Sequence, residues 1–123
     1  MNTIEKTTQG TNEIHKYDVF YIDLGTERNG SIQNGYRPCM VVGNNIGNKY
    51  VPIVLVVPIT TRKKKCLPTH LKVDKEDGLP YNSILLCEQI MTISKEQLGD
   101  KICSLEKKSE FIDKKLHISL ALS

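Results

Sequence analysis

One stretch near the middle of the chain, Val51-Pro-Ile-Val-Leu-Val-Val-Pro-Ile-Thr60, restricts the fold more than any other. It is the most apolar run in the sequence, and it is rich in β-branched residues, which pack well on a pleated surface. A run of this kind predicts a buried central strand. Because proline donates no backbone hydrogen bond, we expect Pro52 and Pro58 to limit this strand to about six residues between them. The rest of the chain must then build a sheet around it.

Shorter stretches on both sides of this run predict further strands. Apolar residues alternate or run continuously at positions 17–24, 39–42, 69–74, 83–90 (continued by Thr92 and Ile93) and 101–105. Turn-forming residues separate these stretches at 25–35, 44–48 and 75–80. Ser94-Lys-Glu-Gln97 matches a capping box, which predicts one short helical turn. We therefore expect several short strands joined by turns.

The pattern becomes helical from Glu106 onward, and Ser104 is the expected N-cap. Apolar residues recur there at the spacing of one helix face, at Ile112, Leu116 and Leu120 with Phe111 and Ile118 beside them. Short strands followed by one amphipathic helix favour a mainly β fold with α (α+β). The expected architecture is a small, strongly bent β-barrel closed by a C-terminal helix.

Length and polarity along the chain predict its domain organisation. A chain of 123 residues is expected to form one domain. Residues 1–16 are polar and poor in apolar groups, which predicts a flexible N-terminal extension before a folded domain at 17–123. No apolar run approaches the length of about 18 residues needed to span a bilayer, and no charged-then-apolar leader is visible. We therefore expect neither a membrane span nor a secretion signal.

Cysteine and histidine spacing argues against a metal site or a nucleophilic thiol. The chain has four cysteines, Cys39, Cys66, Cys87 and Cys103. Three of the four sit in apolar runs, and no C-x-x-C occurs. This predicts buried, reduced thiols and a reducing cytosol. His15, His70 and His117 share no ligand spacing, and the sequence has neither a nucleophile elbow nor a Gly-rich phosphate loop. No metal and no cofactor are expected.

One arginine occupies a position that favours function. In the segment Asn34-Gly-Tyr-Arg-Pro-Cys-Met-Val-Val-Gly43, Gly35 permits a sharp turn and Pro38 suits the first residue of a strand. Arg37 is therefore expected at the mouth of a rigid strand, directly after a long loop. The ordinary alternative is a solvated arginine at a strand end. Polar groups that a rigid element holds in this way often carry function, however.

Two threonines end the central apolar run in a similar setting. Thr60 and Thr61 close the run, and the basic stretch Arg62-Lys-Lys-Lys65 follows them. A guanidinium can bind phosphate bidentately, and a threonine hydroxyl can donate to a non-bridging oxygen. Together with Arg37, either threonine could stabilise the pentacoordinate state of a phosphodiester attacked by its own 2′-OH, without a metal.

The charge balance is compatible with an anionic partner. The net charge is +3, and the 62–65 run would attract phosphate. The alternative for such a run is a solvated loop, which is the commoner role of consecutive charges.

The ordered set of these motifs resembles the MazF/PemK toxins, endoribonucleases of type II toxin–antitoxin systems. The matching segments are Tyr17-Asp-Val-Phe-Tyr-Ile-Asp-Leu24, Gly35-Tyr-Arg-Pro-Cys-Met-Val-Val42, Asn44-Asn-Ile-Gly-Asn48, Pro58-Ile-Thr60, Leu67-Pro-Thr-His70, Ile84-Leu-Leu-Cys-Glu-Gln-Ile90 and Ile118-Ser-Leu-Ala-Leu122. The resemblance extends from Tyr17 to the C-terminus, with order and spacing intact. It is strongest to the branch found in low-GC Gram-positive bacteria.

The resemblance implies a fold and an activity. The fold is a small SH3-like β-barrel of the CcdB/PemK type with a C-terminal helix, homodimeric, with RNA in grooves at the two-fold interface. The activity is metal-independent, sequence-specific cleavage of single-stranded mRNA, which leaves a 2′,3′-cyclic phosphate and a 5′-OH. The implied cleavage motif is of the U-A-C-A-U type. The implied partner is a cognate MazE-like antitoxin that covers the groove, in the cytoplasm.

The resemblance also implies site residues. By position, Arg37 matches the catalytic arginine, and Thr60 matches the catalytic threonine because it follows the Pro-Ile pair; Thr61 is the second choice. The positions that match the RNA-binding groove are Ser31, Gln33, Gly35, Pro38, Thr61, Arg62, Leu67, Pro68, His70, Ser83, Glu88 and Gln89. Glu88 and Gln89 are candidates for contacts with base edges, with ordinary strand packing as the alternative.

A rival hypothesis comes from a different functional class. A non-cleaving CcdB-like gyrase poison, or an inactive RNA-binding relative, would share the fold. Such a protein has no use for the pair formed by Arg37 and Thr60, so this pair is the feature that separates the two hypotheses.

Overall fold

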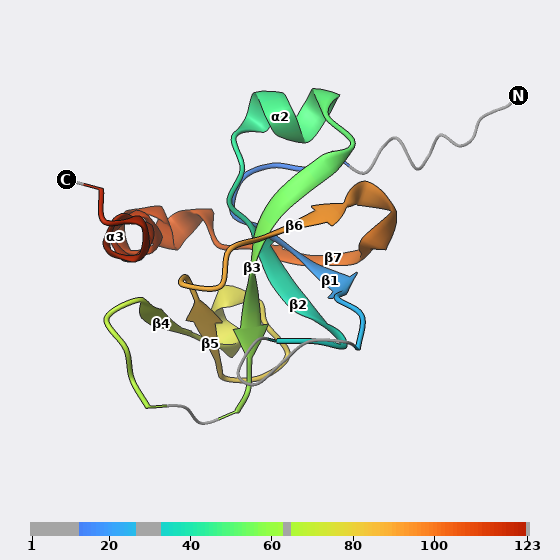
Figure 1. The fold of residues 1–123 in the computed structure, drawn as a ribbon. Helices are drawn as coiled ribbons and strands as arrows, with labels where there is room; N and C mark the ends of the chain where they lie inside the picture. Colours follow the sequence, from blue (N-terminus) through green and yellow to red (C-terminus); the bar gives the residue numbers. More distant parts are fainter. Residues whose placement is uncertain (1–12, 27–32, 63–64, 123) are drawn as a thin grey trace, which may run out of the picture.

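The computed structural model describes residues 13–26, 33–62 and 65–122. Within them the chain forms strands β1 (Asp18–Asp23), β2 (Tyr36–Val41), β3 (Ile53–Thr60), β4 (His70–Val73), β5 (Ser83–Leu86), β6 (Met91–Ser94) and β7 (Leu98–Ser104). The helices are α2 (Asn45–Tyr50) and the C-terminal α3 (Ser109–Leu120), and short 3₁₀ helices occupy Lys75–Asp77, Lys95–Gln97 and Glu106–Lys108. Figure 1 shows α3 and α2 on different sides of the sheet.

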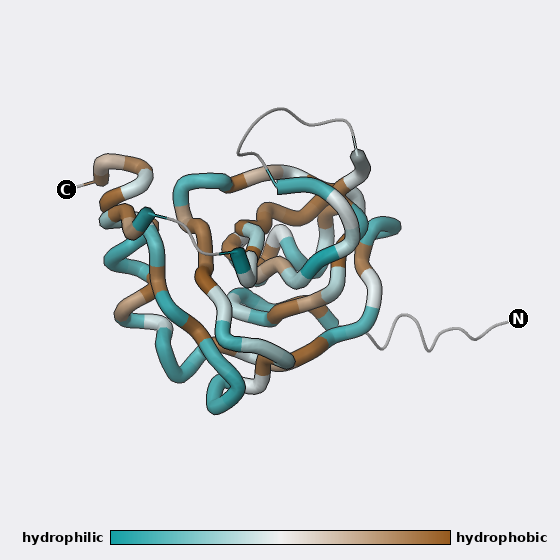
Figure 2. Tube along the Cα trace, turned by 90° about the horizontal axis from the view of Figure 1, so that it is seen from below, coloured by the Kyte–Doolittle hydropathy of each residue, from teal (hydrophilic) through white to brown (hydrophobic). Residues whose placement is uncertain are grey.

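All strands belong to one bent antiparallel sheet. The strand order is β4-β5-β3-β2-β1-β7, and β6 also pairs with β3. The long strand β3 changes partner along its length, since Ile53 to Val56 pair with β6 whereas Ile59 and Thr60 pair with β5. This exchange of partners bends the sheet around its apolar interior, and Figure 2 shows the chain encircling hydrophobic segments. The predicted central strand and the bent β architecture are confirmed.

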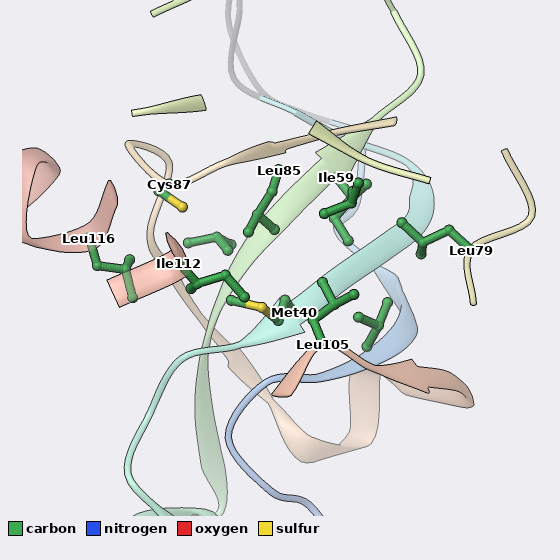
Figure 3. Packing of buried hydrophobic residues seen from close by; sticks show 11 residues of the cluster. Met40, Ile59, Leu79, Leu85, Cys87, Leu105, Ile112 and Leu116 are labelled. Carbon is green, nitrogen blue, oxygen red and sulfur yellow. The ribbon is translucent and has the colours of Figure 1, made fainter. Parts of the chain in front are cut away.

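Alternating residues of β3 supply two apolar cores. Val57 and Ile59 belong to a first cluster that also contains Met40 and Leu85, whereas Val54 and Val56 belong to a second cluster with Cys39. Because successive side chains of a strand point to opposite faces, one strand can serve both clusters. Ile112 and Leu116 of α3 close the first cluster, as Figure 3 shows. The predicted helix therefore covers one end of the barrel.

The structure corrects four details of the predicted elements. Pro58 does not end the central strand but lies within β3. It falls between the part of β3 that pairs with β6 and the part that pairs with β5, so the missing proline N–H breaks no ladder bond at that edge of β3. Residues 44–48 are not a simple turn, because Asn44 caps helix α2 by accepting from the Gly47 N–H. The strand predicted at 83–93 is divided into β5 and β6 by a turn at Cys87 and Glu88.

The fourth correction concerns the C-terminal helix. Ser104 accepts a hydrogen bond from the Glu106 N–H but is the N-cap of neither helix, since the 3₁₀ turn at Glu106–Lys108 follows Leu105 and α3 begins at Ser109, both without a side-chain cap. Only part of its apolar stripe is buried, since Phe111, Ile118 and Leu120 are each more than 50% exposed. The capping box predicted at Ser94 is confirmed, with Gln97 as the reciprocal partner.

The cysteines follow the prediction only in part. All four are free; Cys39 and Cys87 are buried, Cys103 is half-buried and Cys66 is exposed. Burial raises the pKa of Cys87 to about 12 and that of Cys103 to about 11. These two thiols are therefore poor nucleophiles at neutral pH. Within the described part of the chain, no helix is long and apolar enough to cross a membrane.

Candidate functional site

A tight turn delivers Arg37 to the start of β2. Gly35 has a φ of +81°, a conformation that glycine adopts at little cost. The Leu24 N–H donates to the Gly35 carbonyl at 2.9 Å, and the Gly35 N–H donates to the Gly25 carbonyl at 2.7 Å, so the two ends of the loop are held together. Arg37 then pairs with Ile22 of β1. The guanidinium is thus mounted on a rigid strand end, as predicted.

Two neighbouring residues orient the Arg37 side chain. Its Nε donates to the Asn34 carbonyl at 2.6 Å, and its Nη1 donates to Oε1 of Gln33 at 2.5 Å. Among residues 13–26, 33–62 and 65–122, no carboxylate pairs with this guanidinium. Since a guanidinium carries five N–H donors, three remain for an anionic ligand beyond these two bonds. The positive charge is fixed in place and uncompensated by any described side chain.

Thr60 ends β3 and is nearly inaccessible. The residue is 2% exposed, and its Oγ1 accepts a hydrogen bond from the Arg62 N–H at 3.1 Å. Within the described ranges its own O–H has no hydrogen-bond acceptor, so the hydroxyl keeps one donor to offer. Thr61, by contrast, is exposed. The two candidate threonines therefore differ in environment.

A pocket of about 270 Å³ lies beside Arg37. Four predicted site residues line it, namely Arg37, Pro38, Thr61 and Ser83. Four further residues were not predicted from the sequence, namely Tyr21, Ile59, Pro80 and Tyr81. Tyr81 is 64% exposed. The signal that could have identified Tyr81 is its position directly after a proline in a turn. A ring in such a turn does not pack in the core and is left exposed.

A second cluster of predicted residues surrounds Glu88 in the turn between β5 and β6. The Thr69 hydroxyl donates to Oε1 of Glu88 at 2.9 Å, and Nε2 of His70 lies 3.1 Å from Oε2. The Leu67 N–H donates to Nδ1 of His70 at 3.3 Å, which leaves the proton of a neutral ring on Nε2, facing Glu88. The His70 side chain is only 4% exposed, against 29% for that of Glu88.

The hydrogen bonds of this cluster also change the pKa of the Glu88 carboxyl. Burial alone would raise the pKa of its carboxyl. Bonds from its own backbone N–H, from His70 and from Thr69 outweigh burial and lower the pKa below its ordinary value of 4.5. Glu88 is therefore a carboxylate at neutral pH, with its two oxygens held in a defined orientation.

The remaining predicted positions are placed as follows. Gln33 is buried at 5% exposure, and its N–H donates to Oε1 of Gln89 at 3.0 Å. Arg62, Leu67 and Pro68 are exposed. Ser31 lies outside the described residues, as does the middle of the basic run at 63–64. The structure thus brings one set around the Arg37 pocket and another set around Glu88.

A larger hollow of about 670 Å³ lies elsewhere, between the segment before β1, helix α2 and the start of β7. Its lining includes Ile14, Asn48 and Lys95 but none of the predicted site residues. In the described part of the chain, no three His, Cys, Asp or Glu side chains are grouped so as to hold a metal ion. The Arg37 pocket is therefore the candidate functional site, despite its smaller size.

Comparison with known proteins identifies the family. Residues 15–120 match the family of PemK-like, MazF-like toxins of type II toxin–antitoxin systems. Endoribonuclease EndoA of Bacillus subtilis (strain 168) is 42% identical over 112 residues, which cover 89% of this chain and 96% of that protein. The predicted resemblance is thereby confirmed.

Solved structures agree with the fold. A mycobacterial endoribonuclease in complex with its cognate antitoxin superposes with a TM-score of 0.74 at 25% identity, over 89% of this chain and 96% of that one. MazF of Deinococcus radiodurans shares the fold with a TM-score of 0.73 at 16% identity, over 88% and 96% of the two chains. The prediction of a mainly β domain with a C-terminal helix is confirmed, and the chain belongs to the PemK-like, MazF-like toxins of type II toxin–antitoxin systems.

Proposed function

We propose that this protein is the toxin of a type II toxin–antitoxin module and acts as a sequence-specific endoribonuclease on single-stranded mRNA. The observation that carries this proposal is the Arg37 guanidinium, fixed by two hydrogen bonds at the edge of an open pocket with no described carboxylate partner. A fixed, unpaired cation suits a phosphodiester that gains negative charge during cleavage. Membership in a family with a 42% identical endoribonuclease supports the same activity.

The proposed reaction is attack of a ribose 2′-OH on its own 3′-phosphate. A bond forms between the 2′-oxygen and phosphorus while the bond from phosphorus to the 5′-oxygen breaks. The 2′-OH releases its proton to solvent and the leaving 5′-oxygen takes one up from solvent, so that the products are a 2′,3′-cyclic phosphate and a 5′-OH. Arg37 offsets the charge that develops on the non-bridging oxygens and donates a hydrogen bond toward the leaving 5′-oxygen. A guanidinium remains protonated at neutral pH, so it is suited to this electrostatic role rather than to that of a base.

Thr60 is the proposed second catalytic residue, with its hydroxyl donating to a non-bridging phosphoryl oxygen. Support comes from the strand register: β2 and β3 pair Cys39 with Pro58, and extending that register by two residues would set Arg37 opposite Thr60. The hydroxyl also has no acceptor among the described residues. Thr61, which lines the pocket with Arg37, is the alternative donor.

The RNA groove is proposed to extend from the Arg37 pocket toward Glu88. Single-stranded bases are recognised on their edges and by stacking. Ser83 and Thr61 offer hydroxyls, Leu67 and Pro68 offer exposed apolar surface, and the Glu88 carboxylate offers an acceptor for an amino group on a base edge. Arg62 and the rest of the basic run would attract the backbone. The cleavage motif is proposed to be of the U-A-C-A-U type.

The proposed partners are a second copy of the chain and a MazE-like antitoxin, in the cytoplasm. Exposed apolar side chains on β3 and α3 suit an isologous contact, since Ile53, Leu55, Phe111 and Ile118 are each more than 40% exposed. One relative of known structure is described as bound to its cognate antitoxin. For this chain, a partner segment with acidic side chains would complement Arg37 and the exposed Arg62.

The test is cleavage of a long single-stranded RNA in the presence of EDTA, with the new 5′ ends mapped and their hydroxyl chemistry determined. The expected result is a set of discrete cuts at one short motif that persists with EDTA. Arg37→Ala should abolish these cuts without unfolding the protein. Lys107→Ala, which removes an exposed cation from the 3₁₀ turn before α3, is the matched control and should cut normally. An absence of discrete cuts by the unmutated protein would favour the rival, a non-cleaving gyrase poison or inactive RNA-binding relative.

A further inference from the structure

A continuous path of hydrogen bonds runs from Arg37 to the turn between β5 and β6. Nη1 of Arg37 donates to Oε1 of Gln33 at 2.5 Å. The main-chain N–H of Gln33 donates to Oε1 of Gln89 at 3.0 Å, and the main-chain N–H of Gln89 donates to the Leu86 carbonyl at 3.1 Å. The orientation of the guanidinium is thereby tied to strand β5, which is distant from it in the sequence.

Burial decides what Gln33 can do. The residue is 5% exposed, so its amide is poorly placed to meet a base in a solvent-filled groove. Its oxygen already accepts from Arg37, and its main-chain N–H is already bonded to Gln89. Gln33 therefore faces the arginine rather than the RNA, although its position in the sequence first indicated an RNA contact.

The geometry of the two bonds to Arg37 fixes the plane of the guanidinium. Asn34 accepts from Nε through its main-chain carbonyl, while Gln33 accepts from Nη1 through its side chain. A planar group held at two of its nitrogens cannot rotate freely about its last bonds, so its remaining N–H donors point in one direction. Ordering a long side chain in advance removes an entropic cost from the reaction itself.

The chemical type of the acceptor also matters. An amide oxygen is neutral, so it orients the guanidinium without compensating its positive charge. A carboxylate in the same place would form a charge-assisted bond and would weaken the field available to a transition-state phosphate. A buried glutamine is thus a suitable orienting group for an arginine that must stabilise an anion.

We propose that Gln33 is a positioning residue for Arg37, and that Gln89 acts behind it by holding the Gln33 main chain. This inference rests on the proposed function, because it concerns the arginine assigned to catalysis. It predicts that loss of the Gln33 acceptor lowers kcat while KM changes little. A residue that read a base would instead alter KM and the cleavage motif.

The main variant is Gln33→Met, which keeps the length of the side chain but removes the acceptor. We expect kcat on a short RNA containing the mapped motif to fall about tenfold or more, as for other losses of preorganised electrostatics, with KM within about threefold of its original value. Gln33→Glu restores an acceptor and should fall between Gln33→Met and the unmutated protein. An unchanged kcat in Gln33→Met would overturn the proposal, and so would a new cleavage motif.

A matched control separates positioning from general loss of stability. Gln97 is a half-buried glutamine whose side chain also makes two hydrogen bonds, one accepted from the Ser94 N–H at 2.8 Å and one donated to the Asp23 carbonyl at 2.7 Å. Gln97→Met should lower the melting temperature but leave kcat unchanged. If Gln97→Met and Gln33→Met lose kcat equally, the loss reflects stability and the positioning role fails.

A spectroscopic readout tests the inference without activity. The Nη1–H resonance of Arg37, assigned by its disappearance in Arg37→Lys, should exchange slowly with water in the unmutated protein and quickly in Gln33→Met. Slow exchange in both would contradict the proposal. If Gln33→Met does not fold, Gln89→Met provides the same comparison and should also speed the exchange. If the unmutated protein cuts no RNA, the proposed function fails, whereas the exchange measurement still decides whether Gln33 orients Arg37.

Discussion

Cys39 of β2 pairs with Pro58 of β3 at the end of that ladder, and the same antiparallel register, extended by two residues, would set Arg37 opposite Thr60. Residues directly opposite each other in an antiparallel pair project from the same face of the sheet. Extended in this way, the register would set Arg37 and Thr60 on one face of the sheet, although it is Thr61, and not Thr60, that lines the pocket beside Arg37. This relationship favours Thr60 over Thr61 as the partner of Arg37, although Thr61 is the more exposed of the two.

Replacement of each threonine by valine tests this assignment. Valine keeps the branched shape but lacks the hydroxyl. We expect Thr60→Val to reduce the single-turnover cleavage rate by about 100-fold, the usual cost of losing one donor to a developing oxyanion. Thr61→Val should change the same single-turnover rate by less than about threefold. The reverse ranking would transfer the catalytic role to Thr61. Thermal melts of both variants are needed, because Thr60 is buried.

Tyr81 is expected to stack on a base next to the scissile phosphate. Its ring is 64% exposed, and it lines the same pocket as Arg37. A base–aromatic stack is worth about 1–3 kcal/mol, so Tyr81→Ala should raise KM for a short RNA by about tenfold, whereas Tyr81→Phe should leave it nearly unchanged. Tyr50, which is 72% exposed on α2 outside this pocket, provides the control variant Tyr50→Ala. Equal effects of the two alanine variants would argue against a specific stack.

Patterns of hydrophobicity predicted most of the secondary structure because each strand must bury one face. The alternation at Val19 and the apolar run that ends at Thr60 have direct structural counterparts in β1 and β3. The pattern failed where tertiary context decides. Pro58 is tolerated because β3 changes partner around it, and a change of partner leaves no mark on the strand's own sequence. The turn at Glu88 is likewise stabilised by Thr69 and His70, which are remote in the chain.

The candidate site was predictable only as a set of residue types. Arg37 could be placed at a strand mouth because Gly35 and Pro38 flank it. The orientation of its side chain could not, because it depends on Gln33 and, behind that, on Gln89, 56 positions further along the sequence. Tyr81 follows a proline in a turn, a signal that could have identified it as exposed, but its place beside Arg37 arises from the packing of distant strands around one pocket.

Acid should destabilise the fold in part through Asp77. Burial alone would raise its pKa, but hydrogen bonds from the Asp74 N–H at 2.8 Å and from Nζ of Lys108 at 2.9 Å, with the charge of Lys108, lower it below the ordinary value of 3.8. A depressed pKa in the folded state stabilises the protein above the unfolded-state pKa, and this contribution disappears as the pH falls through the folded-state value. The free energy of unfolding should therefore decrease between about pH 5 and pH 3.

The acid effect can be assigned with a pair of lysine variants. Lys108→Met removes the cation bonded to Asp77, so the decrease between those pH values should become shallower. Lys107→Met removes an exposed neighbouring cation and should keep the original slope. Urea unfolding at several pH values measures both slopes. Parallel curves for the two variants would show that the Asp77–Lys108 pair does not contribute to the pH dependence.

Tyr17 joins the start of β1 to the C-terminal helix. Its hydroxyl donates to Oδ1 of Asp113 at 2.8 Å, and burial, followed by this bond and the charge of Asp113, raises the pKa of the phenol to about 12. We expect Tyr17→Phe to lower the free energy of unfolding at neutral pH by about 1 kcal/mol, the usual net value of such a bond. Asp113→Ala should lower the free energy of unfolding by a similar amount, and the double variant should lower it by less than the sum of the two single variants.

The raised pKa of Tyr17 also predicts a pH dependence, because it favours the neutral phenol in the folded state. The difference in free energy of unfolding between the unmutated protein and Tyr17→Phe should be complete below the ordinary pKa of 10.0 and vanish as the pH approaches 12. Equilibrium unfolding across this range measures the difference, and strict additivity of the two single variants would show that the bond does not couple β1 to α3.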